Sequence, residues 1–211
     1  MDPKKVYIFH ITHIENLPRI MAAGGLRCDR LRVQNGEAVM GIAHQRIKDR
    51  RAKRPVFVAA KGTLADYVPF YFAPRSPMLY TIHGGNVDGY TGGQKPIVHL
   101  VSTVDTAVAL GKPWCFTDGH ADMAFSNYSD DLKNLDKVDW TVMKSKFWND
   151  TDLAPDRKRR RQAEFLVHES FPWTAILGIG VLDGEIKTRV TQILAENTHR
   201  PPVAVKGSWY Y

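Results

Sequence analysis

The sequence has few cysteines and no long apolar run. Its two cysteines, Cys28 and Cys115, lie far apart, which excludes a disulfide-stapled scaffold and favours reduced thiols in a cytoplasmic protein. No apolar run approaches the roughly 18 residues that a membrane span needs. No long apolar segment follows Lys4 and Lys5, so a signal peptide is not expected either.

The sequence also lacks a grouping of metal-binding side chains. Its eight histidines are dispersed. His10 and His13 are close together, but no further ligands follow them at a metal-binding spacing. Because zinc needs three or four converging ligands, no metal is expected.

Length and composition are those of a soluble globular protein. The chain has 211 residues, of which 44% are hydrophobic and 24% charged, enough to bury a substantial core. No internal repeat and no linker divides it. We expect one domain over residues 1–211.

Positive charge is in excess and is unevenly distributed. The formal net charge is +7, and basic residues cluster at 46–54 and 157–161. Such clusters are typical of proteins that bind DNA, RNA or a phosphate-bearing ligand. A solvated surface that keeps the protein in solution is the alternative.

Several short strands and helices are predicted, so the expected fold class is α+β. The sequence predicts strands at 6–11, 66–72, 95–103, 114–117, 162–167, 176–181 and 203–205, with a last one at 209–211. It predicts helices at 15–23, 37–53 and 184–196 and mostly helical structure at 130–148, with a turn at 73–78 and loops at 83–94 and 149–161.

The predicted helix at 37–53 ends in a basic side chain on its apolar face. Met40, Ala43, Ile47 and Arg51 fall on one stripe. An arginine in that position either extends its charged end to the solvent or meets a buried anion. The pattern alone favours a solvent-exposed Arg51.

A single acid follows the second basic cluster. Gln162 and Glu164 share one face of a predicted strand, because residues two apart in a strand point the same way. A carboxylate there could stabilise an oxocarbenium-like sugar or accept a hydrogen bond from a ribose. One carboxylate is not a glycosidase pair, and a structural glutamate paired with a neighbouring arginine is the simpler interpretation of Gln-x-Glu alone.

Five stretches of the sequence belong together: FHITHI at 9–14, DYVPFYFAPRSPML at 66–79, FTDGH at 116–120, RQAEFLV at 161–167 and SWYY at 208–211. In this order they resemble the DarT family of bacterial toxins, which are DNA ADP-ribosyltransferases. The resemblance implies an ADP-ribosyltransferase (PARP-like) fold, with a split, mostly antiparallel β core and surrounding helices. It also implies transfer of ADP-ribose from the co-substrate NAD to thymine in single-stranded DNA, with release of nicotinamide and a block of replication. The expected partner is a macrodomain antitoxin of the DarG type.

The resemblance assigns roles to individual positions. It makes Glu164 the catalytic glutamate and Arg51 the arginine that supports NAD and the catalytic centre. It places His10, Thr12 and Tyr71 on NAD, and it places Arg75, Met78, His120 and the basic residues Arg157, Lys158 and Arg160 on DNA. Met78 could instead be a core residue beneath the aromatic strand.

Two other functions remain open on the sequence. A related transferase could modify RNA or a protein. A non-catalytic nucleic-acid-binding domain would explain the charge and the aromatic residues, but it gives no reason for His10, Arg51 and Glu164 to occur together.

Overall fold

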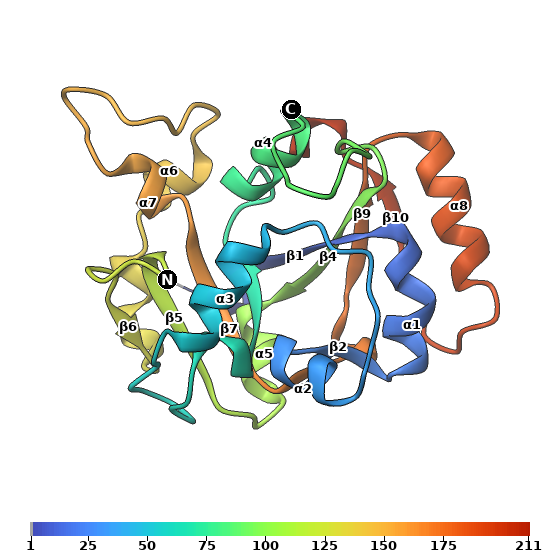
Figure 1. Cartoon of the computed structure of the whole chain (residues 1–211), viewed down its shortest axis with the longest axis horizontal. Coiled ribbons are helices and arrows are strands. Elements are labelled where there is room, and N and C mark those ends of the chain that lie inside the picture. Colours follow the sequence, from blue (N-terminus) through green and yellow to red (C-terminus); the bar gives the residue numbers. More distant parts are fainter. Residues whose placement is uncertain (1) are drawn as a thin grey trace.

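One large, mostly antiparallel sheet organises the protein. The structure is a computed structural model, and it describes residues 2–211. Its eight strands run in the order β10-β9-β4-β1-β3-β7-β5-β6, and only β10 and β9 pair in parallel. Helices lie around this sheet, with α8 and α1 near one edge and α6 and α7 beyond the other (Figure 1). The α+β prediction is confirmed.

The strands and helices have the following bounds. The strands are β1 (Tyr7–His13), β2 (Gly25–Arg27), β3 (Tyr67–Tyr71), β4 (Ile97–Thr103), β5 (Trp114–His120), β6 (Tyr128–Ser129), β7 (Ala163–His168), β8 (Ser170–Pro172), β9 (Gly178–Val181) and β10 (Val203–Val205). The α-helices are α1 (Leu17–Ala22), α2 (Asp29–Gln34), α3 (Gln45–Lys53), α4 (Pro77–His83), α5 (Val104–Ala109), α6 (Trp140–Lys144), α7 (Arg157–Arg160) and α8 (Gly184–Leu194). Short 3₁₀ turns occupy Pro3–Lys5, Ile14–Asn16, Leu64–Asp66, Leu132–Lys137, Trp173–Ala175 and Gly207–Trp209.

The sheet is split between β1 and β3. β1 pairs with β4 along its whole length, and β3 pairs with β7 from Tyr67 to Tyr71. Between β1 and β3 the only backbone register pair is Phe9 with Tyr71. The two halves of the sheet therefore diverge beyond this pair, and polar side chains can reach the gap.

Apolar side chains fill both faces of the central strands. Every residue of β4 is buried, and so are the residues of β7 from Ala163 to Val167. Phe72 packs edge-on against Phe165 at 6.3 Å between ring centroids. These mostly apolar runs, interrupted by His99 and Ser102 in β4 and by Glu164 in β7, are typical of strands that are covered on both faces. The sequence therefore predicted both strands.

The predicted helix at 37–53 begins eight residues late. α3 starts at Gln45, and residues 37–44 are an irregular segment. Gly36 stands at φ +63°, and Gly41 has a low helix propensity. The Asn16 side chain accepts a hydrogen bond from Met40 N at 2.8 Å and donates to Met40 O at 3.0 Å. These bonds replace the helical ones, so Met40 and Ala43 are not part of the stripe.

Three other predictions need correction. The 73–78 turn ends at Pro77, where α4 begins with the Ser76 side chain accepting from Leu79 N at 3.2 Å. The predicted 149–161 loop contains the one-turn helix α7. Residues 209–211 are not a strand, because the chain turns at Gly207–Trp209 and buries Tyr210. Carboxylates from distant segments offset the charge repulsion in α7, and the local sequence did not predict those contacts.

Candidate active site

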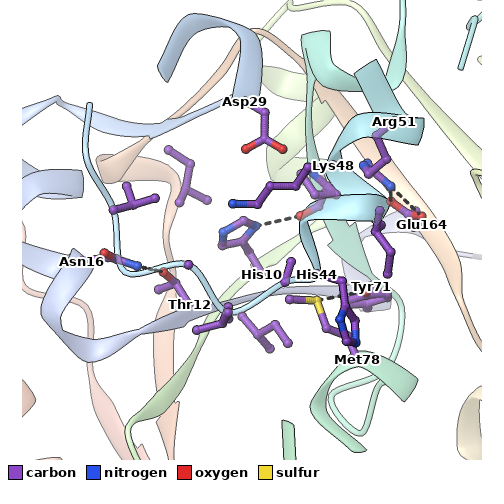
Figure 2. Close-up of a pocket in the computed structure, with 18 of the residues that line it drawn as sticks. His10, Thr12, Asn16, Asp29, His44, Lys48, Arg51, Tyr71, Met78 and Glu164 are labelled. Atoms are coloured by element: carbon purple, nitrogen blue, oxygen red, sulfur yellow. Dashed lines mark hydrogen bonds and ion pairs between the residues drawn. The ribbon is translucent and has the colours of Figure 1, made fainter. Parts of the chain in front are cut away.

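A cavity of about 350 Å³ opens where the sheet is split. Its walls come from β1, the 37–44 segment, α3, β3, the start of α4, and the facing ends of β5 and β7. Figure 2 shows labelled side chains from β1, α3, β3, α4 and β7 around this space. His10, Thr12, Arg51, Tyr71, Met78, His120, Lys158 and Glu164, which the sequence assigned to separate stretches, all line it.

A buried ion pair forms part of the wall. Arg51 on α3 donates from Nη1 to Glu164 on β7, at 2.9 Å to Oε2 and 3.2 Å to Oε1. Only 3% of the Glu164 side chain and 12% of the Arg51 side chain are exposed. The buried-anion alternative for Arg51 therefore describes the structure. The partner of Glu164 lies 113 residues away rather than in the adjacent basic run.

Glu164 is held by further contacts, whereas the Arg51 side chain bonds only to Glu164 within residues 2–211. Ala121 N donates to Glu164 Oε1 at 3.3 Å, and Glu164 N donates to the Thr117 hydroxyl at 3.0 Å. Although burial opposes the charge on Arg51, the Glu164 carboxylate keeps the pKa of this guanidinium above its usual value. Arg51 Nη2 is buried and has no hydrogen-bond partner among residues 2–211. A ligand in the cavity can accept a hydrogen bond from this unused N–H group.

Tyr71 and His120 lie close to the pair. Burial, reinforced by the Glu164 charge, raises the pKa of the Tyr71 hydroxyl, so it stays protonated. Burial lowers the pKa of His120, Glu164 partly opposes this effect, and Arg51 adds to it. His120 is therefore neutral near pH 7. Its Nδ1 is buried and unpaired within the described part of the chain.

His10 and Thr12 occupy the cavity side of β1. The His10 ring reaches across the split to Pro69 O at 2.8 Å from Nδ1. Burial lowers the pKa of His10 to about 4, so the ring is neutral and Nε2 is left to a ligand. Thr12 is buried, and its hydroxyl accepts from Asn16 Nδ2 at 3.1 Å (Figure 2).

Sequence reasoning missed Asn16. This residue is 8% exposed and connects Thr12 on β1 to the backbone of Met40. It therefore holds the 37–44 segment over the cavity. The only sequence signal is that Asn16 follows the polar residue Thr12 by four positions. This spacing does not predict the contact with Met40.

The residues assigned to DNA fall into two groups. Met78 lines the cavity, and the Tyr71 hydroxyl lies 3.7 Å from its sulfur (Figure 2). Arg75 points elsewhere, because its guanidinium stacks on the Tyr211 ring at 4.3 Å from the centroid. The rigid turn before α4 thus directs Met78 and Arg75 to different surfaces.

The basic run at 157–161 is largely engaged within the protein. Arg157 donates to Phe147 O at 2.6 Å, and Arg160 pairs with Asp139 at 2.5 Å. Arg159 pairs with Asp118 at 3.0 Å and Asp156 at 2.7 Å. Lys158 is exposed, lines the cavity and forms no ion pair within residues 2–211.

Two further features concern metal ions and membranes. Among residues 2–211, no three His, Cys, Asp or Glu side chains converge to hold a metal ion. None of the helices that the structure describes is long and apolar enough to cross a membrane.

Comparison with known proteins identifies relatives of the chain. The DarT family model, described as "ssDNA thymidine ADP-ribosyltransferase, DarT", matches residues 9–211. A DNA ADP-ribosyl transferase of Thermus aquaticus is 40% identical, with 99% of this chain and 90% of the relative covered. One of Escherichia coli is 35% identical, with 100% and 96% covered.

Solved structures agree with the sequence matches. Thermus sp. 2.9 DarT in complex with ADP-ribosylated ssDNA has a TM-score of 0.92 at 38% identity, covering 99% of this chain and 98% of that one. The same protein in complex with NAD+ has a TM-score of 0.89 at 36% identity, with both chains covered completely. This chain therefore has the ADP-ribosyltransferase fold and belongs to the DarT family.

Proposed function

We propose that this protein transfers ADP-ribose from NAD to a thymine base in single-stranded DNA and releases nicotinamide. The observation that carries the proposal is the buried pair of Arg51 and Glu164 in a cavity at the sheet split. This carboxylate is held by Arg51 and largely shielded from water. An electrostatic contact to a developing positive charge is strongest in such a site.

The cavity offers groups that suit NAD as a substrate. Arg51 Nη2 is buried without a partner in residues 2–211. His10, Thr12 and Tyr71 add polar atoms on the same walls. Cavities lined mainly by apolar groups, with a few converging polar ones, are typical of small-molecule sites.

The reaction breaks the bond between ribose C1′ and the nicotinamide nitrogen. Positive charge develops on the ribose as this bond lengthens, and we assign Glu164 to its stabilisation. Arg51 keeps the carboxylate oriented through two charge-assisted hydrogen bonds. A new bond then joins C1′ to the thymine base, which gives up one proton.

We assign the DNA side to Met78, Arg75 and His120, together with Arg157, Lys158 and Arg160. Met78 can contact the face or the methyl group of the base, and cationic side chains can hold phosphates. Among the last three, Lys158 is the exposed one on the cavity wall. A single strand suits this site because no base pair has to be opened.

We also propose a role in a toxin–antitoxin pair. In Thermosipho africanus, one relative is named a DNA ADP-ribosyl transferase–DNA ADP-ribosyl glycohydrolase fusion protein. By analogy, the partner would be a macrodomain antitoxin of the DarG type that removes the modification, and unopposed activity would block replication. We further propose that the chain works as a single domain in the cytoplasm, where NAD and replicating DNA are both present.

The test is an incubation of the protein with NAD labelled in its adenylate part. Single-stranded DNA oligonucleotides with and without thymine, an RNA and a protein extract serve as acceptors. We expect label only on thymine-containing DNA. Label on RNA or protein would favour the related transferase, and the absence of transfer to any acceptor would favour a non-catalytic binding domain.

A further inference from the structure

A second cavity lies on the other side of the turn that carries Arg75. It encloses about 690 Å³, and Arg75, Lys144, Ser145, Lys146, Arg161 and Tyr211 are among the residues that line it. Four of these side chains are cationic, and no Asp or Glu of residues 2–211 lines this cavity. We call it the Arg161 cavity. Its lining has the composition of an anion site.

Arg161 contributes a buried charge without a counter-ion. The residue is 3% exposed. Its guanidinium donates only to main-chain carbonyls, including Val142 O at 2.6 Å and Arg75 O at 3.1 Å. Arg159 and Arg160, by contrast, meet aspartates. The positive charge of Arg161 is therefore available to pair with an anion that enters the cavity.

The cost of burying this charge shows in the pKa of the Arg161 guanidinium. Burial lowers the pKa of Arg161 to about 10, and the neighbouring Arg75 lowers it further, while Tyr211 opposes the change. An anion would offset the burial and the repulsion together. A buried, hydrogen-bonded charge gains more from an opposite charge than a solvated one does.

The two arginines of the cavity, Arg75 and Arg161, are held in place before any ligand arrives. Arg161 and the Tyr211 hydroxyl both donate to Arg75 O, at 3.1 Å and 3.0 Å. The Arg75 side chain stacks on Tyr211, and its Nε is buried without a hydrogen-bond partner in the described chain. Lys144 and Lys146 are exposed and form no ion pair among residues 2–211. The fixed positions of Arg75 and Arg161 reduce the ordering that binding would require.

The Arg161 cavity adjoins the active site. Trp148 lines the first cavity, and its indole Nε1 donates to the Tyr211 hydroxyl at 2.9 Å. Met78, in the first cavity, follows three residues after Arg75. The end of the chain lies beside α4 (Figure 1). This helix begins at Pro77, which lines the first cavity, three residues after Pro74, which lines the second. A strand whose base reaches Met78 can place a neighbouring phosphate beside Arg75.

We propose that the Arg161 cavity binds a backbone phosphate of the DNA strand, next to the base that is modified. This proposal rests on the proposed function. It adds Lys144, Lys146 and Arg161 to the DNA-binding surface and identifies a contact that fixes the strand without reading its sequence.

The test uses the two exposed lysines, because substitution of Arg161 would also remove contacts that stabilise the fold. In the Lys144→Gln/Lys146→Gln variant, we expect weaker binding of a thymine-containing oligonucleotide. The slope of log Kd against log salt should fall by about 0.7 for each phosphate that the variant no longer holds. Lys5→Gln/Lys187→Gln makes the same charge change at exposed positions outside both cavities and should leave the affinity and the slope near those of the wild type.

A phosphate scan tests where the contact lies. Single methylphosphonate groups, which are neutral, are placed at each linkage around the thymine. One position should weaken binding to the wild type and to the control variant, but it should have little effect on the Lys144→Gln/Lys146→Gln variant. If this variant gives the same affinity, salt slope and scan as the control, the subsite is wrong.

A phosphate titration distinguishes a strand subsite from a free-anion site. Inorganic phosphate is titrated at constant ionic strength without DNA. Saturable phosphate binding combined with an unaltered DNA scan would overturn the strand subsite in favour of a free-anion site. If the wild type labels no DNA with NAD, the proposed function fails. If it labels DNA but the lysine variant matches the control, only the subsite fails.

Discussion

Arg51 Nη1 lies 2.9 Å from Glu164 Oε2, and this contact connects α3 to β7 across 113 residues of sequence. It brings together the last residue of an apolar helical stripe and the one carboxylate after the basic run. Neither side chain has a second charged partner within hydrogen-bond distance among residues 2–211. Each side chain therefore neutralises the charge of the other, and the loss of either one should affect stability as well as catalysis.

The first prediction concerns the stability of this pair. Arg51→Met should lower the free energy of unfolding by about 3–5 kcal/mol, because it leaves a buried carboxylate without its partner. Arg189→Met is the matched control: Arg189 and its partner Glu15 are 45% and 55% exposed, so breaking this pair should cost about 1 kcal/mol or less. Urea unfolding of both variants measures the difference. Equal losses would mean that the Arg51 pair is not a stabilising contact.

The second prediction separates the residues of the basic run. Lys158→Gln should weaken single-stranded DNA binding and lower the salt slope by about 0.7, because Lys158 has no ion-pair partner in the described chain. Arg159→Gln should chiefly lower the melting temperature, because it breaks contacts to Asp118 and Asp156. Fluorescence anisotropy at several salt concentrations and thermal melts give the two readouts. An unchanged slope for Lys158→Gln would make that side chain a solvated surface group.

The central strands were predictable because they are mostly apolar. The interrupted helix at 37–53 was not, because Asn16 competes for the backbone of Met40 from a distant segment. The short helix α7 was missed for a related reason. Five consecutive cations predict an extended loop unless carboxylates such as Asp139 and Asp118 approach from elsewhere in the chain.

The third prediction concerns choice of base. Met78→Ala should reduce the preference for thymine by about 1–3 kcal/mol, because it removes an apolar contact to the base. Transfer of labelled ADP-ribose to oligonucleotides that differ only at the candidate base measures this preference. Arg75→Ala should instead weaken binding to all of them. A lower melting temperature for Met78→Ala with an unaltered preference would assign Met78 to the core.

The fourth prediction is a loss of stability in mild acid. Burial lowers the pKa of His99 to about 4 in the folded protein, from an ordinary value of 6.5. Between pH 4 and pH 6.5 the unfolded chain binds more protons than the folded protein. The free energy of unfolding is therefore highest above about pH 6.5 and decreases as the pH falls toward 4. Burial lowers the pKa of His10 to about 4 as well, and its effect has the same sign.

The measurement is the free energy of unfolding from pH 7.5 to pH 5. We expect it to decrease, with a limiting slope of about 1.4 kcal/mol per pH unit for each histidine. His99→Gln should be less stable at pH 7.5 and should show a shallower slope. Stability that is constant or rises on acidification would contradict the buried, neutral histidines.

The site was less predictable than the fold. Family resemblance led to His10, Arg51 and Glu164, whereas the residues alone left a solvent-exposed arginine and a structural glutamate as the simpler interpretations. The contact between them depends on how α3 lies across β7, and sequence periodicity does not give that. The Arg161 cavity had no sequence signal, because its cations come from separate segments and are joined through main-chain carbonyls.

The transfer rate of Glu164→Gln tests the central claim most directly. The amide keeps the size of the side chain but removes its charge, so we expect the rate of ADP-ribose transfer to thymine-containing DNA to fall by about 10²-fold or more. Glu196→Gln, at an exposed glutamate outside both cavities, should keep the wild-type rate. Thermal melts establish that both variants are folded. If folded Glu164→Gln transfers ADP-ribose as fast as Glu196→Gln, then Glu164 does not stabilise the reacting ribose.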